Sequence, residues 1–332
     1  MGLAVVSVVL LALGFTYTNG FHDAANAIAT SVSTRALTPR IALALASGMN
    51  LLGAFAGVRV AQTIGRDIVQ TPMGGTGLAI CAAALVGAIS WNMLTWWRGL
   101  PSSSTHALIG GLVGSAVAAG ASGGIHWDGM LRWVLLPMVL SPVVGMVVGY
   151  LVMTALLWVF RRSDPARTTR GFRYAQTVSA ASVAFGHGMQ DAAKAAGIVV
   201  LALVASGHQA TDDASVPWWV LALTAVVMSI GTYAGGWRII RTLGTRIIAI
   251  RPHQGFAAEM TAASILYVAT ATGAPISTTQ AITSAIMGVG STRSTKAVRW
   301  DVAKSILIAW LLTFPGAGLA AAAAYGLIAL VR

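Results

Sequence analysis

The sequence predicts an all-α integral membrane protein with about ten helical segments in two inverted five-segment repeats, with broken or re-entrant helices at the membrane midplane. Three observations support this fold class. Of the 332 residues, 56% are hydrophobic and only 9% are charged, whereas a soluble domain has about 25% charged residues. Apolar stretches long enough to cross a bilayer recur along the chain. Two polar motifs also occur twice, in the same order.

The apolar stretches define the predicted segments, five in each half. They cover 1–30, 41–62, 78–97, 102–120 and 131–160, and then 174–206, 217–237, 257–273, 275–290 and 304–331. The strongly polar stretch between the two groups contains five arginines. The predicted organisation is therefore an N-terminal repeat over 1–160, a cytoplasmic basic linker over 161–173 and a C-terminal inverted repeat over 174–332. An odd number of segments in each half makes the halves run in opposite directions.

Basic residues predict the orientation of the chain. With the N-terminus outside, the cytoplasmic loops carry most of the 21 Lys and Arg residues, and the acidic loop with Asp212 and Asp213 lies outside. Cytoplasmic loops of membrane proteins have such an excess of basic residues. We therefore expect both termini outside the cytoplasmic membrane. The same rule explains the net charge of +12, and no nucleic-acid partner is expected.

Two motifs recur in both halves. The sequence Asp-Ala-Ala-Asn-Ala at 23–27 recurs as Asp-Ala-Ala-Lys-Ala at 191–195. The run Pro-Ser-Ser-Ser-Thr-His at 101–106 recurs as Pro-Ile-Ser-Thr-Thr-Gln at 275–280. Inverted repeats are typical of secondary transporters, in which corresponding interruptions of the two halves form the binding site. The repeated motifs are therefore the predicted site.

Each Asp motif places a carboxylate in the middle of an apolar segment. Burying such a charge costs about 2.5–3.5 kcal/mol on insertion scales, so Asp23 and Asp191 must be paired, protonated or in contact with a hydrated cavity. The flanking glycines predict a helix break at each motif. Asn26 and Lys194 follow three residues later, on the same helical face. A single Asp of this kind also fits the capping of a broken helix or a polar contact that holds helices together, but two at repeated positions favour a binding site.

Each Pro-Ser/Thr run predicts a helix that begins at Pro and continues with hydroxyl side chains. Free backbone N–H groups and hydroxyls at a helix N-terminus form an anion site. The predicted ligands of a tetrahedral oxyanion are Ser103, Ser104, Thr105, Ser277, Thr278 and Thr279. Ordinary N-capping is the alternative for a single motif. It does not explain two such caps in apolar surroundings.

The other polar residues have two interpretations. His22, His106 and His187 are candidate proton carriers or histidines that form hydrogen bonds between helices. We expect Glu259 at the membrane interface. With one cysteine, Cys81, the chain cannot form a Cys-based metal cluster, and no cofactor or resident metal site is predicted. Since the sequence has no evident nucleophile–base pair, we expect that the protein is not an enzyme.

At these motifs the chain resembles the inorganic phosphate transporter (PiT) family. The family's motif positions fall on Asp23, Asn26 and Asp191 and on the runs 102–105 and 277–279. The resemblance implies symport of inorganic phosphate across the cytoplasmic membrane by alternating access, and a homodimer. The partners that it implies are inorganic phosphate, free or as a divalent-metal complex, a proton or sodium ion for coupling, and the lipid bilayer.

The Asp motifs depart from the sodium-coupled branch, which resembles Gly-x-Asn-Asp-x-Ala-Asn-Ala in both halves. His22 and Gln190 stand where that branch has its first Asn, and Lys194 stands where it has the second. The His and Lys versions resemble the bacterial proton-coupled, low-affinity branch. His22, Asp23, Asp191 and Lys194 are therefore the predicted coupling residues.

The predicted role of Lys194 is to balance the charge of Asp191 in place of a metal cation, because an ammonium and a sodium ion in one small site would repel each other. The alternative is that Lys194 extends to the membrane interface. Symport of sulfate or another tetrahedral oxyanion, and sodium-coupled phosphate symport, are the alternative functions.

Overall fold

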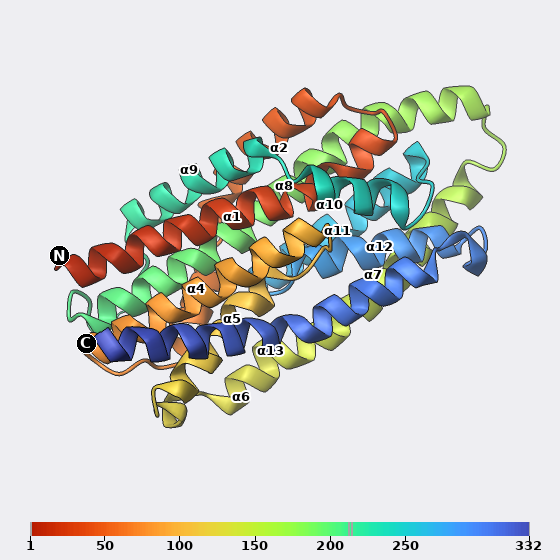
Figure 1. Ribbon diagram of the computed structural model, residues 1–332. Coiled ribbons are helices and arrows are strands. Elements are labelled where there is room, and N and C mark those ends of the chain that lie inside the picture. Colours follow the sequence, from red (N-terminus) through yellow and green to blue (C-terminus); the bar gives the residue numbers. More distant parts are fainter. Residues whose placement is uncertain (1, 212, 214, 332) are drawn as a thin grey trace.

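The computed structural model describes residues 2–211, 213 and 215–331, and it is a bundle of helices that run roughly along one axis (Figure 1). Asp212, predicted in an outside loop, is not among the described residues. The helices are α1 (Leu3–Ser33), α2 (Pro39–Ala54), α3 (Val58–Thr63), α4 (Gly75–Arg98), α5 (Ser104–Ala118), α6 (Trp127–Gly129), α7 (Leu136–Val159), α8 (Pro165–Ala205), α9 (Trp218–Ala234), α10 (Trp237–Arg241), α11 (Pro252–Thr272), α12 (Thr278–Ser291) and α13 (Trp300–Val331). The prediction of an all-α fold is confirmed.

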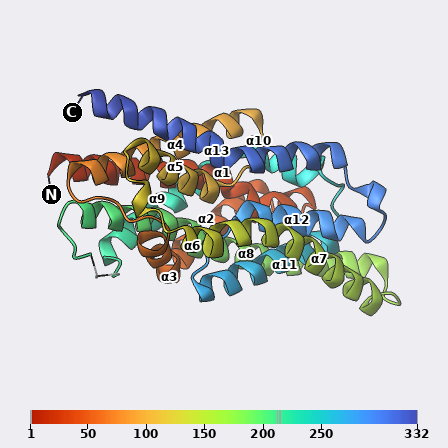
Figure 2. The same ribbon diagram turned by 90° about the horizontal axis from the view of Figure 1, so that it is seen from below.

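Short π-helical and 3-10 turns extend or join these helices. The π-helical turns are Ile64–Ile68, Met130–Leu135 and Thr242–Arg246, and the 3-10 turns are Ser122–Gly124 and Thr295–Ala297. Both ends of the described chain lie at one end of the bundle, and the linker between α7 and α8 lies at the other (Figures 1 and 2).

Five helical stretches are long and apolar enough to cross a membrane: α1, α4, the stretch from α6 to α7, α8 and α13. The bent pairs α2–α3 and α9–α10, with bends of 63° and 60°, bring the number to seven if each pair is one span. The other three predicted segments correspond to α5, α11 and α12. Because α5 and α12 have only 15 and 14 residues, they are shorter than the roughly 20 residues that a spanning helix needs.

The helices that carry the Asp motifs are unbroken, so the predicted breaks at these motifs are wrong. The flanking glycines serve close helix packing instead. A Cβ atom added at Gly20 of α1 would lie 2.7 Å from the carbonyl oxygen of Met228 in α9. One added at Gly188 of α8 would lie 2.3 Å from the carbonyl oxygen of Asn50 in α2. Only glycine permits these approaches, and it remains helical while doing so.

The interior interruptions occur at the two Pro-Ser/Thr runs. Residues 99–103 separate α4 from α5, and 273–277 separate α11 from α12. In each pair the two helices pack side by side as a hairpin. The α4–α5 hairpin lies toward the end of the bundle that holds the termini, and the α11–α12 hairpin toward the other end (Figures 1 and 2). The hairpin turns meet between them, where the Thr105 hydroxyl donates to the Ile276 carbonyl at 3.1 Å.

Each half completes the other. The last helix of the first half, α7, packs along α11 and α12, while α13 packs along α4 and α5. In the same way α9 packs on α1, and α2 packs on α8. These reciprocal contacts are the pattern expected of an internal repeat. The opposite orientation of the two halves and their bounds, 1–160 and 174–332, stay predictions.

Exposed apolar side chains cover the outer surfaces of α7 and α13. Val143, Leu151, Leu311 and Leu319 are among them, and each is 56% to 73% exposed. An apolar surface of this extent is rare on proteins in water. It fits contact with lipid chains, so the fold is that of a multi-pass membrane protein.

Candidate functional site

The two Asp motifs and the two hairpin turns meet in one buried place. It is built from four elements: α1, α8, and the starts of α5 and α12. The residues that come together are Asp23, Asn26, Ser104, Thr105, Asp191, Lys194, Thr278 and Thr279, none more than 3% exposed. Buried polar groups are costly unless they form hydrogen bonds. Here they satisfy one another across the two halves.

Asp23 on α1 accepts hydrogen bonds from both halves. The Ser104 hydroxyl donates to its Oδ2 at 3.0 Å, and the Thr279 hydroxyl donates to its Oδ1 at 3.2 Å. His22 Nδ1 lies 2.8 Å from the same Oδ1, and His22 Nε2 lies 3.1 Å from the Thr95 hydroxyl. Asp23 is therefore in direct contact with an imidazole, and this imidazole connects it to Thr95 on α4.

Asp191 on α8 is paired with Lys194. The Lys194 ammonium donates to Asp191 Oδ1 at 2.6 Å, to the Thr105 hydroxyl at 2.6 Å and to the Ile276 carbonyl at 2.7 Å. His187 Nε2 lies 3.0 Å from the other carboxylate oxygen. Since Lys194 is only 1% exposed, the interpretation that it extends to the membrane interface is wrong.

Asn26 holds the equivalent position on α1. Its Nδ2 donates to the Thr279 hydroxyl at 2.9 Å and to the Thr278 hydroxyl at 3.2 Å. Its Oδ1 is buried and has no hydrogen-bond partner within the described part of the chain. The two halves thus differ in charge here, with a neutral amide in one and an ammonium in the other.

The first hydroxyls of each helix are caps. Ser103 Oγ accepts from the backbone N–H of His106, and Ser277 Oγ accepts from that of Gln280, both at 3.2 Å. Ordinary N-capping therefore accounts for the conformation of Ser103 and Ser277. The hydroxyls that follow are the ones that reach the carboxylates and Lys194.

Asp23, His187 and Asp191 could also contact a metal ion. Each offers one ligand atom, and these atoms lie within 4.8 Å of one another. The ammonium of Lys194 beside Asp191 opposes a permanently bound cation by electrostatic repulsion. The geometry of these three residues thus permits contact with a cation, while the charge of Lys194 weakens its binding.

Glu259 is a buried acid that the sequence analysis misplaced. We expected it at the membrane interface, but it is fully buried within the bundle. The hydroxyls of Thr30 and Ser31 on α1 donate to its Oε1 at 2.5 Å each, and Ser179 on α8 donates to its Oε2. Glu259 thereby connects α11 to both Asp-bearing helices. The sequence signal for this cluster was the run of hydroxyl residues in otherwise apolar segments.

The acid cluster around Glu259 is not repeated at the equivalent positions of the other half. Glu259 lies 16 residues before Pro275, and the residue 16 before Pro101 is Leu85. The residue equivalent to Thr30, seven after the Asp of its motif, is Ile198. Both Leu85 and Ile198 are buried in the apolar core, so the two halves are related in packing but not in polarity.

Known proteins resemble the chain over nearly its whole length. The profile of the phosphate transporter family matches residues 19–321. The chain is 42% identical to a probable low-affinity inorganic phosphate transporter of Bacillus subtilis (strain 168), over 98% of this chain and 97% of that protein. It is 43% identical to a protein of the same name from Rhizobium meliloti (strain 1021), over 96% of this chain and 95% of that protein.

A solved structure agrees with this likeness. The structure titled "The sodium-dependent phosphate transporter" matches with a TM-score of 0.89 and 25% identity, over 100% of both chains. These relatives are named as transporters and not as enzymes. On the family profile and on the identities to these relatives, the chain belongs to the phosphate transporter family.

Proposed function

We propose that this protein is a proton-coupled symporter of inorganic phosphate in the cytoplasmic membrane. Its family and the names of its relatives support phosphate as the substrate. The observation that carries the proposal is the convergence of hydroxyl donors from both hairpin turns on two buried carboxylates. Hydroxyls and helix N-termini bind an oxyanion through neutral donors, which allows phosphate to be released again after transport.

Proton coupling follows from competition for the same donors. Ser104 and Thr279 donate to Asp23, and a bound phosphate needs such donors for its own oxygens. Protonation of Asp23 weakens it as an acceptor, since a charged acceptor forms roughly twice as strong a hydrogen bond as a neutral one. The hydroxyls then become available to phosphate. Proton binding and phosphate binding therefore favour each other, as thermodynamic linkage requires.

His22 and Lys194 have different roles beside the two carboxylates. His22 lies 2.8 Å from Asp23 and passes a proton to or from it. Lys194 neutralises Asp191 permanently, through a bond of 2.6 Å. Its three oxygen partners are a carboxylate, a hydroxyl and a carbonyl, the ligands that hard cations prefer. With the ammonium in this position, a sodium ion is not needed there.

Phosphate differs from sulfate in the proton that it carries near neutral pH. The Oδ1 of Asn26 is a buried acceptor to which no described residue donates. A site with such an acceptor rejects an anion that cannot donate, because the acceptor would be left unpaired. This argument favours phosphate over sulfate.

Phosphate could also enter as a complex with a divalent ion. The ligand atoms of Asp23, His187 and Asp191 lie close enough to contact such an ion while hydroxyls hold the phosphate. Uptake of radiolabelled Co²⁺ that requires phosphate, and that Asp191→Asn abolishes, supports this form of the substrate. Equal Co²⁺ uptake with and without phosphate contradicts it.

Alternating access requires movement, because every residue of the site is buried. We propose that the α4–α5 hairpin with α13 opens the site toward the end that holds the termini, and that the α11–α12 hairpin with α7 opens it toward the other end. The reciprocal packing of the two hairpins supports this scheme. The basic linker between α7 and α8 supports a cytoplasmic location of the second end, by the positive-inside rule.

The proposed function is tested by uptake of radiolabelled phosphate into proteoliposomes that contain the purified protein. We expect an inward proton gradient to drive accumulation, with no change when external Na⁺ is replaced by K⁺. Excess sulfate should leave uptake unchanged. Strict dependence on Na⁺ without response to a proton gradient contradicts proton coupling, and inhibition by sulfate at equal concentration contradicts the choice of substrate.

A further inference from the structure

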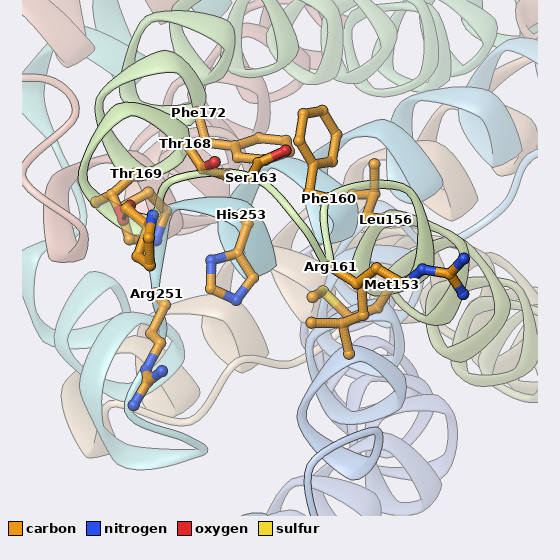
Figure 3. Close-up of a pocket in the computed structure, with 13 residues that line it drawn as sticks. Met153, Leu156, Phe160, Arg161, Ser163, Thr168, Thr169, Phe172, Arg251 and His253 are labelled. Atoms are coloured by element: carbon orange, nitrogen blue, oxygen red, sulfur yellow. Dashed lines mark hydrogen bonds between the residues drawn. The ribbon is translucent and has the colours of Figure 1, made fainter.

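A cavity of about 500 Å³ lies far from the Asp motifs, between the end of α7, the linker, the start of α8 and the start of α11 (Figure 3). The linker and the helix ends that line it lie at the end of the bundle opposite the termini (Figures 1 and 2). None of the residues proposed to bind phosphate or protons lines it. The cavity is therefore separate from the proposed phosphate and proton site.

The lining of the cavity combines two kinds of side chain. One wall is apolar and consists of Met153, Leu156, Leu157, Phe160 and Phe172. The rest is polar or basic and includes Arg161, Ser163, Thr168, Arg251 and His253. In Figure 3 the His253 ring lies in the middle, Ser163 and Thr168 lie together on one side, and the two arginines extend outward from the rim.

The rim is positively charged and lacks compensating acids. Residues 161–173 contain five arginines and one aspartate. That aspartate, Asp164, caps α8 by accepting from the backbone N–H of Arg167 at 2.7 Å. Neither Arg161 nor Arg251 forms an ion pair with any residue that the structure describes. Arg161 lies over the Trp158 ring, 5.0 Å from its centroid, and no described acid neutralises either charge, so both can attract an anionic ligand.

The apolar wall continues onto the outer surface of α7. Leu157 lines the cavity and is 48% exposed, and Leu151 and Val147 expose 58% and 52% on the same helix. A ligand that uses both the wall and the rim has an apolar chain and an anionic head. A soluble anion would leave the apolar wall in water, which is unfavourable.

We propose that this cavity binds an anionic phospholipid. Its phosphate group lies at the rim, where Ser163 and Thr168 supply neutral donors, and an acyl chain lies along the α7 wall. The Arg161 and Arg251 side chains, which extend outward in Figure 3, turn inward when the phosphate binds. Basic pockets between membrane helices on the cytoplasmic side suit anionic head groups, and arginine suits phosphate through its paired N–H donors. A bound lipid connects α7 of the first half to α8 and α11 of the second.

The test is native mass spectrometry of the full-length protein with phosphatidylglycerol or with phosphatidylcholine. We expect phosphatidylglycerol to bind more tightly to the wild type. The double variant Arg161→Gln/Arg251→Gln should lose roughly tenfold or more of this affinity, since it removes two charged donors, while phosphatidylcholine binding stays unchanged. The matched control is Arg162→Gln/Arg167→Gln, which removes the same charge from linker residues that do not line the cavity; it should retain the preference.

Three results overturn the proposal. Equal loss of phosphatidylglycerol in both double variants would mean a general charge effect without a site. Displacement of the lipid by pyrophosphate would assign the cavity to a soluble anion. If the arginine variant does not fold, the double variant Ser163→Ala/Thr168→Ala is measured instead. Unchanged phosphatidylglycerol affinity in this serine and threonine variant also contradicts the proposal.

Discussion

The Lys194 ammonium lies 2.6 Å from the Asp191 carboxylate, and both groups are almost completely buried. A hydroxyl and a backbone carbonyl complete three oxygen contacts around the same nitrogen. The charge is covalently attached to α8, so it cannot cross the membrane as a free ion does. In the mechanism that we propose, a different ion therefore drives uphill transport, and this is the physical reason for proposing a coupling proton.

Replacing Lys194 with Asn is expected to make phosphate uptake depend on sodium. The oxygen atoms that now contact the ammonium become free to bind Na⁺, and the Asn side chain adds another oxygen. Uptake into proteoliposomes should then be about tenfold faster with external Na⁺ than with K⁺ at the same proton gradient. The control Lys194→Met removes the charge without adding an oxygen and should be inactive in both. The same rate in Na⁺ and K⁺ for Lys194→Asn speaks against a cation-like role of Lys194.

The variant Asp23→Asn should exchange phosphate but not accumulate it. An amide cannot take up a proton, so the competition for the Ser104 and Thr279 hydroxyls no longer depends on pH. Counterflow of labelled phosphate should persist, while accumulation driven by a proton gradient should be lost. The control Asp67→Asn changes an exposed carboxylate outside the site and should behave like the wild type. Normal accumulation by Asp23→Asn would exclude this residue as the proton carrier.

Removing single hydroxyls should weaken phosphate affinity moderately. One neutral hydrogen bond contributes about 0.5–1.5 kcal/mol, so Ser104→Ala and Thr279→Val should each raise the KM for phosphate about 2- to 13-fold. The concentration dependence of uptake measures this change. Ser115→Ala is the matched control, because this buried α5 hydroxyl bonds only to carbonyls away from the site. An unchanged KM in the double variant Ser104→Ala/Thr279→Val would mean that these hydroxyls do not contact phosphate.

Glu259→Ala is expected to destabilise the fold. The variant leaves Thr30, Ser31 and Ser179 without their common acceptor, and one unsatisfied buried group costs about 1–3 kcal/mol. The Tm of the purified protein in detergent should fall clearly. Glu259→Gln keeps one carbonyl oxygen and should lower the Tm less. If both variants melt like the wild type, the cluster does not stabilise the contact of α11 with α1 and α8.

The order and type of the helical segments could be predicted from the sequence, because length and apolarity decide which stretches cross a membrane. The positions of the helix breaks could not be predicted from the sequence. Gly20 and Gly188 would fit a break as well as a close contact, and only the position of α9 and α2 distinguishes the two. The breaks occur instead where Pro101 and Pro275 follow a glycine-terminated helix.

The residues of the candidate site could be predicted from the sequence because they recur in both halves. Which of them contact each other could not be predicted, since this depends on how the two halves pack together. Asp23 meets Thr279 over a separation of 256 residues, and Lys194 meets Thr105 over 89. Glu259 has no polar counterpart in the first half, so the repeat gave no reason to place it in the interior.

The last helix of each half packs against the other half, and this also determines when the helices can pack together during synthesis. The helix α7 leaves the ribosome long before α12, the helix that it packs against. A Cβ atom at Gly149 would lie 2.8 Å from the Ala285 carbonyl. This face of α7 therefore fits α12, which has not yet been synthesised when α7 emerges. Chains are made from the N-terminus, and the first half must therefore wait in the translocon or the bilayer with that face uncovered. A chain truncated after the linker should be degraded, and co-expression of the second half as a separate polypeptide should rescue it.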